Sequence, residues 1–400
     1  MPPVFIRPLP KVPVLGWRSF SYGVPTSLPG LCHLPERALT TSGRAAMLAA
    51  LRQLVLPPGS VVLVPTYHCP TMVAPILHAG LTPAYFPIGA DGLPQLDGIS
   101  AAVAAQARAM FVAHYFGLPQ SLQAVSDWCR SRQITLIEDC AHSFFGRAGD
   151  RPIGAWGDYA TASLTKFFPV AEAGLLASAH QRLKPLGLRR QGAKAQLKGL
   201  LDVFEFAHQH AHLGGISHLL DPLFKLKGRN RPVPESGFSP RSQSPAKYAP
   251  PAGADAMMAY CDMGRVEHAP TAAAMALYAV LPHGTIVNRR RANYLGLSRG
   301  LAGASGAHVM RPVLPDDAAP YVLPLWVDDA QRADLVYAGM RAAGLPVFRW
   351  DLSWPGTPID PQDTASLWNR QVLQLLCHQN LDPEHITRMA HLTVQLLQAH

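Results

Sequence analysis

Charged side chains are scarce in this chain: Asp, Glu, Lys and Arg make up 15% of its 400 residues, whereas 48% are hydrophobic. This composition excludes an intrinsically disordered protein, because it provides ample apolar surface for burial. Cysteine is also scarce, and its six residues form no CxxC pair and no regular spacing. We therefore expect reduced thiols in a cytoplasmic protein and no disulfide framework. We also expect no signal peptide and no membrane span, because the start of the chain is rich in proline and no apolar run is long enough.

Positive charge is concentrated in residues 181–250, which we call the basic insert. It contains twelve Lys and Arg against four Asp and Glu, a difference of +8 in a chain whose formal net charge is +9. The remainder is nearly neutral, so the charge does not predict a nucleic-acid-binding protein. Within the insert, one predicted helical face combines the apolar residues Leu197, Leu200, Leu201, Phe204 and Ala207. The insert can contact a membrane surface peripherally or close over an anionic substrate, although a solvated or dimer-covering flap is the simpler interpretation.

The first part of the chain alternates predicted strands and helices. Val61–Val64 is an apolar, β-branched run ended by a proline, which predicts a buried strand. Ser42 is a suitable cap for a helix through Leu51. Repeated βαβ units predict an α/β fold with a mostly parallel central sheet flanked by helices, whose ligands bind beyond the carboxyl ends of the strands. The other predicted elements are strands at 83–87, 109–113 and 135–138 and helices at 72–78, 99–107 and 121–132.

The C-terminal part predicts a smaller α+β domain. Its expected elements are helices near 263–280, 289–301 and 329–342, strands at 321–327 and 347–350, and an amphipathic helix after Asp382. We therefore expect an N-terminal arm (1–30), a large ligand-binding domain (31–280) that includes the basic insert, and a small C-terminal domain (281–400).

Two residues at predicted strand ends carry the strongest chemical signal. Asp139 ends the strand that begins at Thr135, and Lys166 follows further along the chain. This pair suits pyridoxal phosphate, because the lysine forms a Schiff base with the aldehyde and the carboxylate keeps the pyridine nitrogen protonated. Taken singly, a lysine is usually a surface charge and an aspartate often caps the next helix. Together they predict a pyridoxal phosphate site in the large domain.

Five motifs stand in a characteristic order: Thr41–Ala46, Val64–Pro70, Val112–Gly117, Ile137–His142 and Ser163–Gly174. In this order they resemble the DegT/DnrJ/StrS sugar aminotransferase family, whose members are fold type I pyridoxal phosphate enzymes. The resemblance covers roughly residues 30–180 well and residues 255–400 more loosely. It implies a homodimer that transfers an amino group from an amino acid donor to a nucleotide-linked keto-sugar. The pathways implied are polysaccharide, glycolipid or secondary-metabolite biosynthesis.

The resemblance also assigns a phosphate site. The cofactor phosphate is implied at Ser42 and Gly43, where a helix begins and free backbone N–H groups favour an anion. Arg44 stands where relatives more often have threonine. A hydroxyl shortly before the lysine is implied as a second phosphate ligand, and both Thr161 and Ser163 suit this role.

Around the cofactor ring, the resemblance implies Lys166 as the catalytic residue, Asp139 at the ring nitrogen and His142 near the phenolic oxygen. The aromatic residue that stacks on the ring in relatives aligns with Cys69 here. Tyr67 and His68 precede it, and either is a candidate to take its place. An ordinary core position for Tyr67 is the alternative.

Other departures from the family pattern leave alternatives open. Relatives usually have Gly-Gly after the glutamate that here is Glu172, whereas this chain has Ala173 and Gly174, and it has no Gly-Tyr-Asn tripeptide. A reaction of the same cofactor on a non-sugar ketone and a non-catalytic regulatory relative therefore remain alternatives. His208 and His212 share a predicted helical face, but the pair alone does not predict a metal site. Arg349 is a candidate for binding a donor carboxylate, with a surface ion pair as the alternative.

Overall fold

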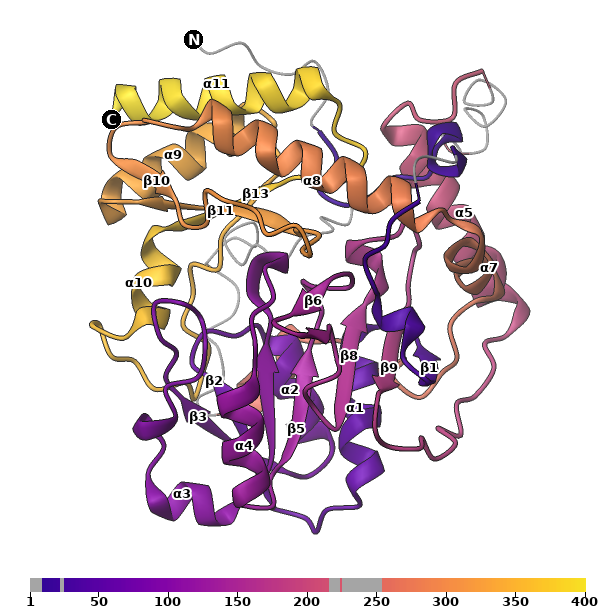
Figure 1. Ribbon diagram of the computed structural model, residues 1–400. Coiled ribbons are helices and arrows are strands. Elements are labelled where there is room, and N and C mark those ends of the chain that lie inside the picture. The colour runs from indigo at the N-terminus through magenta and orange to yellow at the C-terminus, as the bar shows by residue number, and fades with distance from the viewer. Residues whose placement is uncertain (1–8, 22–24, 216–223, 225–253) are drawn as a thin grey trace.

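The computed structural model describes residues 9–21, 25–215, 224 and 254–400, which form two main sheets, each with its own covering helices (Figure 1). A seven-stranded sheet lies within residues 36–178, and a four-stranded sheet lies within residues 307–376. The predicted α/β fold with a mostly parallel central sheet and a smaller α+β part is therefore confirmed.

The large sheet has the strand order β1-β9-β8-β5-β4-β2-β3. Neighbours among β2, β3, β4, β5 and β8 pair in parallel, whereas β9 is antiparallel to both β8 and β1. A parallel strand that is buried on both faces is apolar along its length, as in the sequence VVLVP of β2. The strands are β1 (Glu36–Thr40), β2 (Val61–Pro65), β3 (Thr82–Phe86), β4 (Ala107–Ala113), β5 (Thr135–Asp139), β8 (Tyr159–Ser163) and β9 (Gly174–Ser178).

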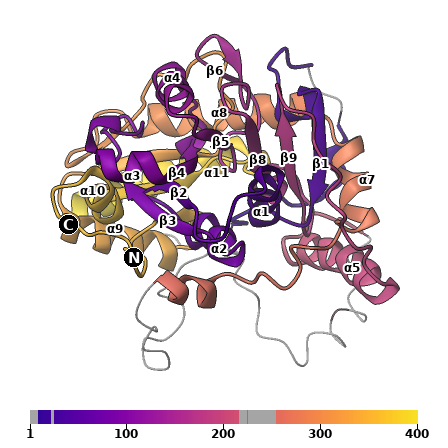
Figure 2. The ribbon, with the colours of Figure 1, turned by 90° about the horizontal axis from the view of Figure 1, so that it is seen from below.

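Helices cover both faces of the large sheet. Helices α1 (Gly43–Leu54) and α2 (Pro70–His78) lie on one face and α4 (Gln123–Ser131) lies on the other (Figure 2). The Ser42 hydroxyl accepts a hydrogen bond from the Ala45 backbone N–H at 3.3 Å, which confirms the predicted cap of α1. The remaining helices are α3 (Ala101–Gln106), before β4, and the packed pair α5 (Ala193–Gln209) and α7 (Ala272–Val280), beyond β1.

The small sheet is antiparallel, with the order β10-β11-β13-β12. Helices α8 and α11 pack side by side across it, and α9 packs on α11 and on the sheet (Figure 1). As the amphipathic pattern predicts, α11 buries Ile386, Met389 and Leu392. The elements are α8 (His283–Gly300), β10 (Ala307–Val309), β11 (Val322–Val327), α9 (Ala330–Ala342), β12 (Val347–Phe348), α10 (Thr364–Gln371), β13 (Val372–Leu376) and α11 (Pro383–Ala399).

The described start of the chain is attached to the part with the small sheet. The Leu9 N–H donates to the Gly344 carbonyl at 3.1 Å, and the Val14 N–H donates to Asn380 Oδ1 at 3.0 Å. The division into an arm, a large domain and a small domain, with boundaries at residues 30 and 280, stays a prediction.

Two predictions of helices need correction. The helix expected near 263–280 begins only at Ala272, because Pro270 disfavours helical geometry before it and the Thr271 side chain caps the later start. In α5 the apolar face is rotated from the one expected: Val203 and Ala207 are buried, whereas Leu197 is 58% exposed and Leu200 is 40% exposed. The cause is packing of α5 against Val14 and Leu15 of the chain start.

Among the described residues, none of the helices has both the length and the apolar character needed to cross a membrane. Much of the basic insert, including Lys225, Lys227, Arg229 and Arg231 and the proline-rich residues 232–251, lies outside the described residues.

Candidate active site

Lys166 lies just beyond the carboxyl end of β8, in a single turn of 3-10 helix, Leu164–Lys166. Its Nζ atom lies 5.2 Å from the centre of the Tyr321 ring. No carboxylate among the described residues forms an ion pair with this amine. Burial lowers the pKa of Lys166, although Cys69 and Asp139 oppose that effect. The side chain is therefore more easily held as a neutral, nucleophilic amine than a surface lysine.

Asp139 is the last residue of β5, and its side chain is buried. Burial raises its pKa, while the positive charge of Lys166 opposes the rise, so the two groups share one site. Oδ1 accepts a hydrogen bond from the Ala141 N–H at 2.9 Å, and Oδ2 has no donor among the described residues. A turn follows Asp139 and not a helix, so the alternative role as a helix cap does not apply. The second oxygen is left for an N–H group of a bound molecule.

A small polar corner lies beside this pair, where the start of α1 meets the end of β8. A methyl group on Gly43 would stand 3.2 Å from Ser163 Cβ, so glycine allows the close approach of the two segments. The Ser163 hydroxyl lies 3.3 Å from the Thr165 hydroxyl. Thr161 is fully buried in the sheet, where its hydroxyl donates to the Glu138 carbonyl at 3.4 Å. Of the two predicted hydroxyls, the structure therefore brings Ser163 to Gly43.

His142 and Cys69, a residue of the Pro65–Pro70 turn, both lie near Lys166. The His142 ring stacks on Tyr321 with centres 4.5 Å apart, and burial together with the Lys166 charge holds its pKa well below the usual value. Burial raises the pKa of Cys69, and the nearby charge of Lys166 opposes it, so this thiol belongs to the same site. His142 is therefore a neutral imidazole at neutral pH.

Tyr67 and His68 make their contacts elsewhere. The Tyr67 ring packs on Trp350 at 4.9 Å, and its hydroxyl accepts a hydrogen bond from Gln374 Nε2 at 3.3 Å. The His68 ring stacks on Tyr85, and its Nε2 lies 2.8 Å from the Thr357 hydroxyl. Burial lowers the pKa of His68 to about 4. The predicted stacking role of either residue is not tested by these contacts and stays a prediction.

The segment after Lys166 packs against the start of helix α1. A methyl on Gly174 would stand 2.1 Å from the Ser42 carbonyl oxygen, so this position admits only glycine, whereas Ala173 places its methyl in the core. Glu172 accepts hydrogen bonds from Gln191 Nε2 at 2.7 Å and the Thr271 N–H at 2.8 Å, and pairs with Arg265. Arg44 points away from this corner, because its Nε donates to the Asp262 carbonyl at 2.5 Å.

Three residues of the site come from the part with the small sheet, and sequence reasoning missed them. Tyr321 faces Lys166, and Trp350 packs on Tyr67 and lies 5.4 Å from the His142 ring. Arg290 of α8 is fully buried and donates from Nη2 to the Lys166 carbonyl at 2.5 Å. No local sequence pattern marks these three residues, because each contacts a residue that is more than a hundred positions away in the chain.

Arg349 departs from both expected roles. Its side chain is buried, pairs with Asp334 and donates to the backbone carbonyls of Asn369 and Arg370. It is therefore a buried internal link and not a surface ion pair. Its donors are used within the small-sheet part.

The donor set of the site fits pyridoxal phosphate. A buried carboxylate, which has one oxygen without a donor among the described residues, raises the lowered pKa of a nearby amine, and a glycine-lined helix start with two hydroxyls stands beside them. These are the groups that an aldehyde, a protonated ring nitrogen and a phosphate each require.

Comparison with known proteins agrees with this geometry. The model of the DegT/DnrJ/EryC1/StrS aminotransferase family matches residues 32–199. A curated relative from Acidithiobacillus ferrooxidans, UDP-N-acetyl-3-dehydro-alpha-D-glucosamine 3-aminotransferase, is 29% identical over 173 residues, which cover 41% of this chain and 46% of the relative. GDP-perosamine synthase of Vibrio cholerae is 26% identical over 203 residues, covering 48% of this chain and 55% of the relative. The chain thus spans about half the length of the curated relatives it matches.

Solved structures match nearly the whole fold at low identity. The sugar-product complex of DesI has a TM-score of 0.63 at 17% identity, covering 99% of this chain and 94% of that one. The Helicobacter pylori aminotransferase PseC has a TM-score of 0.61 at 13% identity, covering 92% of this chain and 90% of that one. The fold is therefore that of these aminotransferase structures. By sequence, residues 32–199 match the model of the DegT/DnrJ/EryC1/StrS aminotransferase family, and the expected resemblance to this family is confirmed.

Proposed function

We propose that this chain is a pyridoxal phosphate-dependent aminotransferase that moves an amino group from an amino acid donor to a nucleotide-linked keto-sugar. The observation that carries the proposal is the approach of Lys166 and Asp139 at the carboxyl ends of β8 and β5, beside the Gly43–Ser163 corner. The family match and the names of the curated relatives, which include UDP-, dTDP- and GDP-sugar enzymes, support it.

Each side chain of the site has a proposed part in the chemistry. Pyridoxal phosphate, when bound, supplies a ring that accepts the electron pair left on the substrate carbon. Asp139 would hold the protonated ring nitrogen, for which Oδ2 is the oxygen without a donor among the described residues. Lys166 would hold the cofactor aldehyde through Nζ, and this amine is the group placed to move a proton between carbon atoms of the substrate and the cofactor. Because burial lowers the pKa of Lys166, its Nζ gives up a proton more readily than an exposed lysine does.

The phosphate is proposed to bind the first N–H groups of α1, the Ser42–Gly43 segment and the Ser163 hydroxyl. The helix start offers unpaired N–H groups and a positive dipole end. Thr161 is proposed to support this corner from behind, because its hydroxyl donates to the Glu138 carbonyl. The Arg44 guanidinium donates to the Asp262 carbonyl and so points away from the phosphate. His142 lies beside the ring as a neutral imidazole, and Tyr67 and His68 support the wall of the site.

The protein is proposed to act as a cytoplasmic homodimer. Exposed apolar side chains on the packed helices α5 and α7 support the dimer, because a second copy would cover Leu197, Leu200, Met275 and Val280, which are 39% to 58% exposed. Peripheral membrane contact through the basic insert remains part of the proposal, and the described residues 181–215 carry six of its cations.

The test is a panel of UDP-, dTDP- and GDP-linked keto-sugars with glutamate or glutamine as donor. Turnover with one nucleotide keto-sugar and none with the matching nucleotide-free sugar is the expected result. Replacing Lys225, Lys227, Arg229 and Arg231 with Ser should raise the Michaelis constant for this substrate and weaken its salt dependence. Turnover of a simple amino acid and keto acid pair, but of none of the nucleotide sugars, would show that the sugar assignment is wrong.

A second candidate is amination of a cyclic ketone without a nucleotide. It is favoured by a relative from Micromonospora echinospora, named as a putative 3-amino-2,3-dideoxy-scyllo-inosose aminotransferase, which is 30% identical over 145 residues. Because the Lys166–Asp139 pair serves either acceptor, the same panel extended with inososes separates the two functions. A protein that binds no pyridoxal phosphate would revive the non-catalytic alternative.

A further inference from the structure

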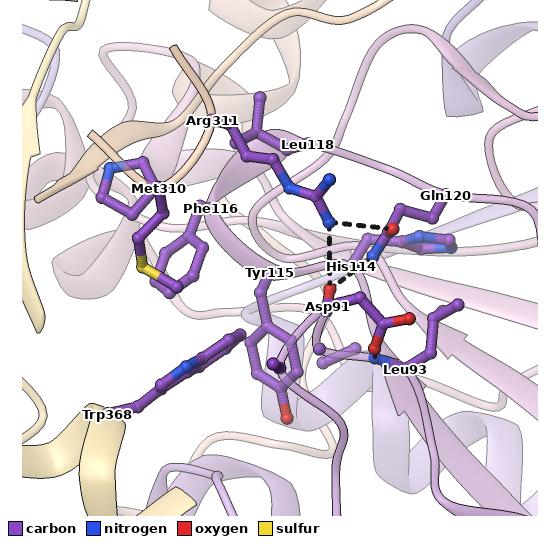
Figure 3. Close-up of a pocket in the computed structure, with 14 residues that line it drawn as sticks. Asp91, Leu93, His114, Tyr115, Phe116, Leu118, Gln120, Met310, Arg311 and Trp368 are labelled. Carbon is purple, nitrogen blue, oxygen red and sulfur yellow. Dashed lines mark hydrogen bonds between the residues drawn. The ribbon is translucent and has the colours of Figure 1, made fainter. Parts of the chain in front are cut away.

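A cavity of about 320 Å³ lies where the parts with the large and small sheets meet. One side is formed by residues 90–93, 113–116, 118 and 120, and the other by Met310, Arg311, Pro324 and Trp368 (Figure 3). Lys166 and Asp139 do not line it. Cavities that bind small ligands begin at about 300 Å³. This cavity is therefore large enough for a small organic molecule.

The inner wall of the cavity is aromatic. Trp368 packs edge-on against Tyr115 at 5.6 Å and tilted against Phe116 at 5.3 Å (Figure 3). The Tyr115 hydroxyl points away from the cavity toward the Tyr67 carbonyl, to which it donates at 2.5 Å. The ring surfaces that remain are apolar, and a flat apolar body packs well against such faces and edges.

The cavity is lined by an arginine, Arg311, that forms no ion pair with a carboxylate among the described residues. Arg311 Nη2 donates to Gln120 Oε1 at 3.1 Å and to the Asp91 backbone carbonyl at 3.4 Å (Figure 3). The Asp91 carboxylate instead accepts a hydrogen bond from the Leu93 N–H at 2.9 Å. Among the described residues, no carboxylate pairs with Arg311. An exposed guanidinium held by two neutral acceptors is well placed to take a bidentate anion.

We propose that this cavity binds a small molecule with a flat apolar body and one carboxylate group. The body lies against Trp368, Tyr115 and Phe116, and the carboxylate pairs with Arg311 in place of the Gln120 and Asp91 acceptors. Such a ligand contacts both parts of the chain at once. It therefore stabilises their association and raises the temperature of unfolding.

The test uses the purified full-length protein with indole-3-acetate as the probe and its neutral analogue indole-3-acetamide for comparison. Isothermal titration should show saturable binding of the acid. Binding should be at least about tenfold weaker for the amide and for Arg311→Ala, because each removes one half of the charge pair. Arg108→Ala, at an exposed arginine that does not line the cavity, is the matched control and should bind like the original protein.

Leu93→Trp fills the mouth of the cavity and should abolish binding of both probes. The proposal is overturned if indole-3-acetate gives no saturable heat up to its solubility limit. Equal affinity for acid and amide, or unchanged affinity in Arg311→Ala, overturns it as well. If Leu93→Trp fails to fold, the exposed Arg311→Ala variant decides alone. Since no turnover is measured, the outcome is independent of the proposed amination.

Discussion

Arg290 is predicted to be the main support of the Lys166 turn, and replacing it with methionine should weaken the fold and the site together. The side chain is fully buried, and among the described residues no carboxylate pairs with it. It donates to the Lys166 carbonyl at 2.5 Å, the Pro320 carbonyl at 3.2 Å and Gln379 Oε1 at 3.0 Å, and its guanidinium lies 4.4 Å from the centre of the Phe167 ring. It thereby links α8 to the catalytic turn and to the residue before Tyr321.

The cost of Arg290→Met follows from these contacts. Three oxygens lose a donor: the bond to the Pro320 carbonyl is buried, and the bonds to the Lys166 carbonyl and Gln379 Oε1 are partly buried. A buried polar atom without a partner costs about 1–3 kcal/mol, so the loss for all three is at most about 9 kcal/mol. The substitution also removes a buried charge without an acidic partner, and this relief offsets several kcal/mol. Burial lowers the pKa of Arg290 to about 10, because the charged form is less stable in this position than in water. A net loss of about 3 kcal/mol is expected.

Chemical denaturation measures this loss, and pyridoxal phosphate titration measures the effect on the site. Arg299→Met, at an exposed arginine of the same helix, is the control and should change stability by less than about 0.5 kcal/mol. Arg290→Met should also bind the cofactor more weakly, since the Lys166 backbone loses its anchor. If Arg290→Met unfolds at the same denaturant concentration as Arg299→Met and binds the cofactor equally well, the three hydrogen bonds do not support the turn.

Three further outcomes are expected. Asp139→Asn should keep the fold and the cofactor but lose most transamination, because the ring nitrogen loses its anion, and near-normal turnover would speak against the role. In the cofactor-free protein, competitive acetylation should show that Lys166 loses its proton at a lower pH than an exposed lysine such as Lys198. In Asp139→Asn this pH should fall further, because Asp139 raises the pKa of Lys166. An unshifted profile would contradict the burial argument. The pKa of His68 falls from 6.5 to about 4 on burial, so stability should be lost as the pH drops from 6.5 toward 4, where the unfolded chain binds a proton that the folded chain does not. His68→Gln should remove up to about 3 kcal/mol of that loss, and an equally steep acid profile would exclude His68 as its source.

The sequence predicts the parallel half of the large sheet because its strands are apolar and β-branched, as in VVLVP of β2. It indicates a strand before Lys166 without fixing the bounds of β8, and it does not reveal β9, because the sequences YATAS and GLLAS are rich in small residues. Their strand conformation depends on pairing with β5 and β1, on either side of them. Tertiary pairing of this kind leaves no local periodicity to detect.

The candidate site divides along the same line. Lys166, Asp139 and Ser42 were predictable because strand ends and a helix start bring chemically suited groups to one edge of a parallel sheet. Tyr321, Trp350 and Arg290 were not, since packing of the small-sheet part against the large one places them there. The sequence leaves open whether Thr161 or Ser163 is the second phosphate ligand. The two residues differ in their contacts, because Ser163 lies beside Gly43 of α1 whereas the Thr161 hydroxyl donates to the Glu138 carbonyl.

The most direct test of the account is where the cofactor attaches. Purified protein reconstituted with pyridoxal phosphate is reduced with borohydride, digested and mapped by mass spectrometry. The account predicts a pyridoxyl group on Lys166, its absence in Lys166→Arg, and no change in Lys198→Arg. A label on a different lysine, or none after reconstitution, would contradict the central claim.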